Sequence, residues 1–166
     1  MRLRALLALA VTAAVLGAAA LAWADTDVIR DSVNETKALR DNGRVDIVKA
    51  IAGHDGPLLK HTIVVREHID RDRKRERPLL AINVRGNESS DPEFLIYGDD
   101  IFKNPKLGKP SRIGPAQLSG HGERWVYRFD PRDFPGGLGR YGWAAFTTTA
   151  KALDVVPNNS YVTHRP

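Results

Sequence analysis

The sequence predicts an all-β fold, an antiparallel β-sandwich of the immunoglobulin-like or jelly-roll-like type. After residue 24, no segment sustains a helical period over several turns. Short runs of alternating apolar residues recur instead, and clusters of Gly, Pro, Asn and Asp separate them. Many short strands with regularly spaced turn signals are typical of sandwiches and barrels. A length of 166 residues suits a single domain.

The N-terminal segment, residues 1–24, has the three parts of a secretory signal peptide. Arg2 and Arg4 provide a basic start, Leu6–Leu21 is an apolar run, and Ala22-Trp23-Ala24 offers small residues to a signal peptidase. We expect cleavage after this segment and a secreted, extracellular protein, with an uncleaved membrane anchor as the alternative. Residues 25–166 then form one β-sandwich domain whose ends we expect to be loosely ordered.

The first two confident strands form a predicted hairpin. Val45–Ala52 and Leu58–Val65 alternate in hydropathy, and His54-Asp55-Gly56-Pro57 between them is a turn signal. In the first of these strands we expect Ile47 and Ile51 to share one face. We expect one side of the hairpin to be buried.

Four more strands are predicted from alternation or from β-forming residues. They are Leu79–Val84, Phe94–Tyr97, Trp125–Phe129 and Tyr141–Thr149. One or two shorter strands, such as Ser111–Gly114, are expected inside the otherwise irregular segment Asp99–Gly122.

Three segments are harder to interpret. In Asp25–Leu39, Val28-Ile29 could begin a strand and Glu35–Arg40 could form one helical turn. The charged run Arg66–Arg77 is interpreted as a solvated hairpin tip or a strand edge protected by charge. We expect the residues from position 158 onward to be a frayed or loosely docked tail.

Four aromatic residues are the leading candidates for ligand binding. Trp125 and Tyr127 lie on one predicted strand, and Tyr141 and Trp143 lie on another. Exposed aromatic rings on a β-sandwich can stack on sugar rings. The alternative is that the same rings fill the core, because aromatic side chains usually dominate protein interiors.

A basic loop is the second candidate surface. Lys103, Lys106, Lys109 and Arg112 follow one another without an intervening acidic residue. They could contact an anionic cell-envelope polymer, in an interaction weakened by salt, or simply solubilise the loop. The formal net charge of +5 falls to +3 without the two arginines of the leader, which is too small an excess to argue for nucleic acid.

We expect no cofactor and no metal, with a structural calcium ion as the alternative. Calcium takes six to eight oxygen ligands, and aspartates at strand ends and turns can supply them. The candidates are Asp46, Asp99, Asp100, Asp130, Asp133 and Asp154, which match no known loop motif. The chain has no cysteine, so neither disulfides nor thiolate ligands are available.

The histidines indicate no active site at the level of sequence. His54, His61, His68, His121 and His164 show no paired metal-binding spacing. No nucleophile, base and acid can be assembled around any of them. We interpret them as structural or solvated residues, and we expect that the protein is not an enzyme.

Four segments carry a resemblance to a known class of domain. A predicted strand begins at Gly43–Ile47, and Leu58–Val65 is the strand expected to pair with it. Later in the chain, Tyr141–Ala145 is followed by Leu153–Pro157. This arrangement resembles exported actinobacterial β-sandwich domains of unassigned role, which are similar to carbohydrate-binding family nine and DOMON-like sandwiches. The resemblance implies a sandwich fold, and sugar-binding relatives use stacking aromatics and a structural calcium.

The sequence therefore favours a secreted, non-enzymatic binding module for carbohydrate or a cell-envelope polymer. The alternative is a secreted structural or protein-interaction domain. We expect no nucleic-acid partner and no membrane span after signal cleavage.

Overall fold

The computed structural model describes residues 26–31, 46–69, 77–85, 91–105, 108–148, 153–157 and 160–166. These residues form strands and their connections, together with one turn of 3-10 helix, η1 (Pro131–Asp133). The predicted all-β fold is confirmed. The leader, residues 1–24, and the helical turn expected over 35–40 lie outside the described residues.

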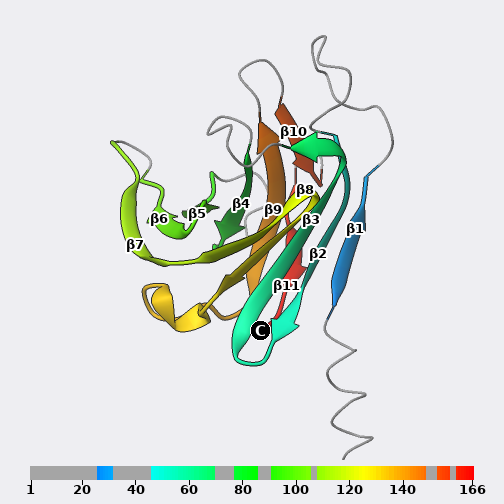
Figure 1. Cartoon of the computed structure of the whole chain (residues 1–166). Helices are drawn as coiled ribbons and strands as arrows, with labels where there is room; N and C mark the ends of the chain where they lie inside the picture. Colours follow the sequence, from blue (N-terminus) through cyan, green and yellow to red (C-terminus); the bar gives the residue numbers. More distant parts are fainter. Residues whose placement is uncertain are drawn as a thin grey trace, which may run out of the picture.

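The strands belong to two antiparallel sheets (Figure 1). The first sheet has the order β1-β2-β3-β8 and the second has the order β10-β9-β4-β5-β6-β7, with β11 also pairing β9. The strands are β1 (Asp27–Arg30), β2 (Ile47–Asp55), β3 (Leu58–Ile69), β4 (Arg77–Asn83), β5 (Phe94–Tyr97), β6 (Asp100–Lys103), β7 (Ser111–Pro115), β8 (Gln117–Phe129), β9 (Tyr141–Thr148), β10 (Leu153–Val156) and β11 (Val162–His164).

The predicted hairpin is present as β2 and β3. Their register runs from Ile47 opposite Val65 to Asp55 opposite Leu58, and Gly56 supplies the positive φ of +62° that the turn needs. A bulge between Ile47 and Lys49 shifts the inward face of β2. As a result Ile47 and Ala50 are buried while Ile51 is only half-buried, so the expectation that Ile47 and Ile51 share one face is wrong.

Strand β8 folds back on itself. Gly120 and Gly122 have φ values of +102° and +66°, and Ser119 Oγ donates to the carbonyl oxygen of Val126 at 3.4 Å. Figure 1 shows the yellow-green ribbon of β7 continuing into β8, which then turns back. Its first half thus extends β7, and its second half pairs β3, so that this ribbon joins the two sheets.

The core lies between the sheets and is rich in aromatic side chains. The largest fully buried ones are Trp125, Tyr127, Phe129, Tyr141 and Trp143. Burying aromatic rings of this size removes about 150–250 Å² each from water, so these residues dominate the hydrophobic stabilisation.

Opposite the β7–β8 ribbon, side chains rather than a backbone ladder connect the sheets. The backbone N–H of Ile47 on β2 donates to Oδ2 of Asp154 on β10 at 2.6 Å. His164 on β11 lies 2.6 Å from Oδ2 of Asp27 on β1, measured from Nδ1. We call this edge, where β1 and β2 meet β10 and β11, the seam.

Two sequence interpretations need correction. For the charged run Arg66–Arg77, the hairpin-tip alternative is wrong, because β3 and β4 at its two ends belong to different sheets, whereas the strand-edge alternative stays a prediction. The C-terminal tail is not loosely docked, because β11 pairs β9 with Val162 opposite Trp143, and His164 is buried.

Candidate functional site

The four candidate aromatic residues are buried. Trp125, Tyr127 and Trp143 have exposed fractions of 0%, and Tyr141 has 1%. Alternation on β8 and β9 points these rings into the space between the sheets, where the hydrophobic effect favours them most. The prediction of an exposed stacking platform is therefore wrong, and the rings fill the core instead.

The basic loop is exposed where the structure describes it. Lys103, Lys109 and Arg112 are exposed, whereas Lys106 lies outside the described residues. Arg112 Nε donates to Oδ1 of Asp100 on the neighbouring strand β6, so part of its charge is neutralised locally. Within the described residues, Lys103 and Lys109 form no ion pair.

A shallow groove of about 320 Å³ lies where the basic loop begins. Two connections form it: the one between β4 and β5, and the one that leaves β6. Its lining residues are Arg85, Asp91, Pro92, Glu93, Lys103, Asn104 and Pro105. Sequence reasoning pointed to only one of them, Lys103, because the groove forms only where the β4–β5 connection meets the end of β6.

Hydrogen bonds fix the walls of the groove. Asn104 donates from its backbone N–H to the carbonyl of Glu93 at 2.8 Å and from Nδ2 to the carbonyl of Pro92 at 3.0 Å. The carboxylate of Glu93 accepts the backbone N–H of Val84 at 2.9 Å and pairs with Arg85 Nε at 3.0 Å. The groove therefore has a preformed floor and balanced charges on its lining.

An aromatic residue stands close to the acidic side of this groove. Tyr161 is half-buried, and burial raises the pKa of its hydroxyl, with the carboxylates of Glu93 and Asp91 adding to the effect. The Cβ of Tyr161 packs so closely on Gly142 that a side chain at that glycine would lie within 2.8 Å of it. The absence of a side chain at Gly142 thus leaves room for Tyr161.

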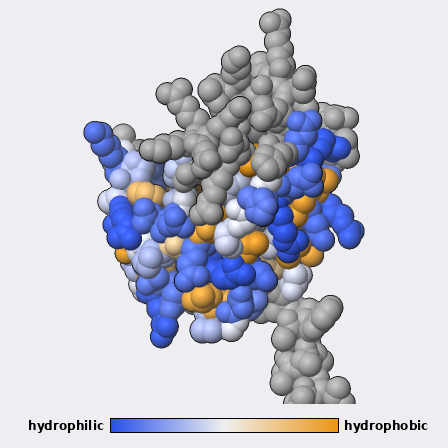
Figure 2. Space-filling model, in the orientation of Figure 1, coloured by the Kyte–Doolittle hydropathy of each residue, from blue (hydrophilic) through white to orange (hydrophobic). Residues whose placement is uncertain are grey.

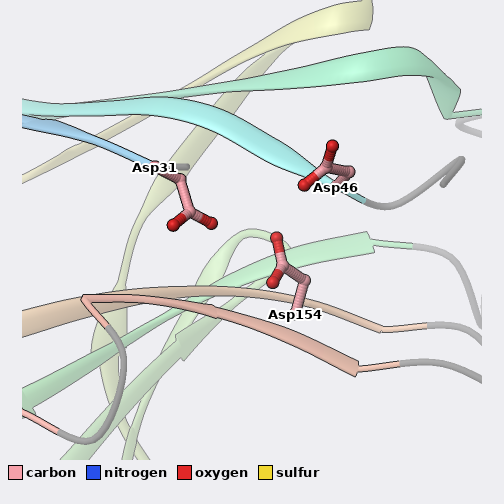
Figure 3. Close-up of side chains that lie close together, drawn as sticks. All are labelled: Asp31, Asp46 and Asp154. Carbon is pink, nitrogen blue, oxygen red and sulfur yellow. The ribbon is translucent and has the colours of Figure 1, made fainter. Parts of the chain in front are cut away.

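Three aspartates gather at one end of the seam (Figure 3). Asp31 follows β1, Asp46 precedes β2 and Asp154 lies on β10. One carboxylate oxygen from each lies within 4.8 Å of the others, and Asp46 and Asp154 are buried. Oxygen ligands in such a cluster could hold a hard cation such as Ca²⁺.

Two contacts partly compensate the negative charge of the three aspartates. Arg66 Nε pairs with Oδ2 of Asp46 at 2.6 Å, and the N–H of Ile47 donates to Asp154. Carboxylates held close together in a partly buried site repel one another strongly. A divalent cation bound among them would relieve this repulsion.

The acidic residues named from the sequence separate into two groups. Asp46 and Asp154 meet, joined by Asp31, which sequence reasoning missed because the pairing of β1 could not be predicted. The others serve local roles. Asp99 Oδ1 accepts the N–H of Leu118 at 2.9 Å, and the Arg132 hydrogen bonds at η1 lower the pKa of Asp130 to about 2.

The histidines also divide by burial. His54 and His121 are exposed, whereas His61 and His164 are buried in the core beside the seam. His61 Nε2 is hydrogen-bonded to the hydroxyl of Tyr141 at 2.8 Å. The interpretation of these two as structural residues stays a prediction.

The visible face of the molecule is predominantly hydrophilic, with apolar residues scattered among polar ones (Figure 2). Among the described residues, the large exposed apolar side chains are Val28, Val84 and Tyr97, which belong to different elements. This distribution resembles an ordinary solvated surface.

Comparisons with known proteins return no relative: no family model, no curated protein and no solved structure matches the chain. The resemblance to exported actinobacterial sandwiches stays a prediction. In the described part of the chain, no helix has the length and apolar character needed to cross a membrane.

Proposed function

We propose that the chain is an exported, non-enzymatic binding module that holds a carbohydrate or cell-envelope polymer in the groove beside the basic loop. The observation that carries the proposal is the groove itself, a hollow of about 320 Å³ whose lining combines a guanidinium, an ammonium, two carboxylates and an amide. Sites of this kind fix a polar ligand by a few well-placed groups.

The lining chemistry suits a polyhydroxylated chain. Carboxylates and the amide oxygen accept hydrogen bonds from hydroxyl groups, whereas Arg85, Lys103 and the amide N–H groups donate them. The rings of Pro92 and Pro105 add apolar surface for the C–H faces of a sugar. Because the positive and negative groups balance, the ligand need not be a polyanion, and the lysines steer anionic polymers toward the groove at low salt.

The proposal is tested by sedimentation with insoluble cell-wall polysaccharide. Lys103→Ala and Lys109→Ala remove the same charge from the same loop, but only Lys103 lines the groove. We expect Lys103→Ala to weaken retention severalfold and Lys109→Ala to change it little at physiological salt. Equal losses from both would indicate diffuse charge attraction instead of a groove site. No retention of the wild type would favour the structural or protein-interaction alternative.

Export is supported by the tripartite leader of residues 1–24. Mass spectrometry of the protein recovered from culture medium tests it. A mature N-terminus at Asp25 is expected, and an intact N-terminus in the membrane fraction would instead indicate an anchor.

A further inference from the structure

A cluster of three histidines, two of them buried, lies beside the seam at the end away from the aspartates. His61 on β3 is fully buried, and its ring stacks on Phe129 of β8 with centroids 5.5 Å apart. Trp143 of β9 meets the same ring edge-on at 4.7 Å. His61 is thus an ionisable residue in the centre of an aromatic core.

Two more imidazoles stand beside it. The ring centroid of His164 on β11 lies 6.2 Å from that of His61 and 5.4 Å from that of His54 on β2. The Nδ1–H of His164 donates to the carboxylate of Asp27 on β1 at 2.6 Å. This bond ties the C-terminal strand to the first described strand across the seam.

The neighbours of His61 would stabilise a positive charge on its ring only weakly. Of the groups that face His61, Tyr141 on β9 is neutral, His164 and His54 are cationic when protonated, and Asp27 reaches the cluster only through His164. In the described part of the chain, Nδ1 of His61 and Nε2 of His164 are buried and have no hydrogen-bond partner. A proton on either buried nitrogen would therefore be left without an acceptor, which is costly in a core.

We propose that these residues form an acid-operated clasp, in which protonation of the His61 cluster releases strand β11 and opens the seam. Strand β11 is the part able to move, because it has only three residues and β9 is its only partner among the described strands. Its release would let water reach His61 and would separate His164 from Asp27.

The direction of the pH dependence follows from comparing the pKa of His61 in the closed and the open form of the protein. Burial, with smaller contributions from His164 and His54, lowers the pKa of His61 from 6.5 to about 3 in the closed protein. The open form binds the proton near the ordinary value, so the closed form binds fewer protons. Above pH 6.5 protonation of His61 therefore contributes nothing to opening. Below that value, opening becomes favoured by up to about tenfold per pH unit.

Amide hydrogen exchange in the full chain, corrected for intrinsic rates, measures the opening directly. We expect the amides of β11 to be less protected than those of β4 at the centre of the second sheet. Their protection should fall about tenfold per pH unit below 6.5. Protection of β11 that equals that of β4, or that does not vary between pH 7.5 and 4.5, would overturn the clasp.

Two substitutions separate His61 from other titrating groups. His61→Gln keeps a polar side chain but cannot be protonated, and it should abolish the pH dependence of β11 protection. His121→Gln, at an exposed histidine on β8, should leave it unchanged. If His61→Gln does not fold, the His61 ring proton shifts of the wild type decide. They should stay those of neutral imidazole while β11 protection falls, and a normal titration near pH 6.5 in the closed protein would contradict the proposal.

Discussion

The backbone N–H of Ile47 donates to the buried carboxylate of Asp154 at 2.6 Å, across the seam between β2 and β10. The two residues are separated by 107 positions in the chain. Near this point the sheets are connected through a side chain, so Asp154 contributes to how the two layers dock. It is also one of the three clustered aspartates.

Substitutions at Asp154 should distinguish its hydrogen bond from its charge. Asp154→Ala leaves the buried N–H of Ile47 without this acceptor, and we expect a loss of about 1–3 kcal/mol in the free energy of unfolding. Asp154→Asn keeps an acceptor oxygen and removes one of three clustered charges, so it should cost much less in the absence of divalent cations. Urea denaturation in the presence of a chelator measures both. Equal losses would show that the charge, not the bond, matters.

Calcium should stabilise the protein through the same cluster. A ligand that binds only the folded state adds about 1.4 kcal/mol for each tenfold rise in its concentration above Kd. We therefore expect the unfolding temperature of the wild type to rise with Ca²⁺ and to return after chelation. Asp31→Asn should remove this response, whereas Glu123→Gln, at an exposed acid on β8, should retain it. A wild-type melting temperature indifferent to Ca²⁺ would argue against a metal at this site.

Local turn chemistry and alternation made part of the fold predictable. The β2–β3 hairpin follows from a turn containing Gly56 between two alternating runs, and β5 (Phe94–Tyr97) has the predicted boundaries. The sequence predicts one or two short strands within Asp99–Gly122 but does not place β6, because Asp100–Lys103 is short and gains its order from pairing with β5 and β7. Strand β11 was missed for the same reason, since its order depends on β9.

The candidate sites were less predictable because they depend on topology. Alternation places Trp125 and Trp143 on one face of their strands, but it does not say whether that face meets solvent or the other sheet. Asp31 and Asp154 come from opposite ends of the chain, and only the meeting of β1, β2 and β10 joins them. The groove likewise requires the β4–β5 connection to meet the connection that leaves β6.

The two buried tryptophans should respond differently to the same substitution. Trp125 Nε1 donates to the carbonyl of Gly122 at 2.9 Å, whereas Trp143 Nε1 has no hydrogen-bond partner in the described residues. Both are fully buried. Trp125→Phe therefore loses volume and a bond, whereas Trp143→Phe loses volume only.

We expect Trp125→Phe to destabilise the protein by about 1 kcal/mol more than Trp143→Phe, as measured by urea denaturation. Replacement of either by Ala should cost about 3–5 kcal/mol, because a large cavity is left in the core. Polymer retention should survive Trp143→Phe, since that ring is not part of the groove. Loss of retention by a folded Trp143→Phe protein would revive a binding role for this residue.

Gly120 and Gly136 provide a matched test of the fold-back in β8. Both have positive φ, +102° and +82°, so an alanine at either meets backbone strain of roughly 1–2 kcal/mol. A Cβ at Gly120 would lie 2.2 Å from the carbonyl oxygen of Arg124, whereas one at Gly136 would meet nothing within 4 Å. We expect Gly120→Ala to lower the unfolding temperature well beyond the effect of Gly136→Ala, because the two halves of β8 would be forced apart. Similar shifts for the two variants would mean that β8 does not turn back at this point.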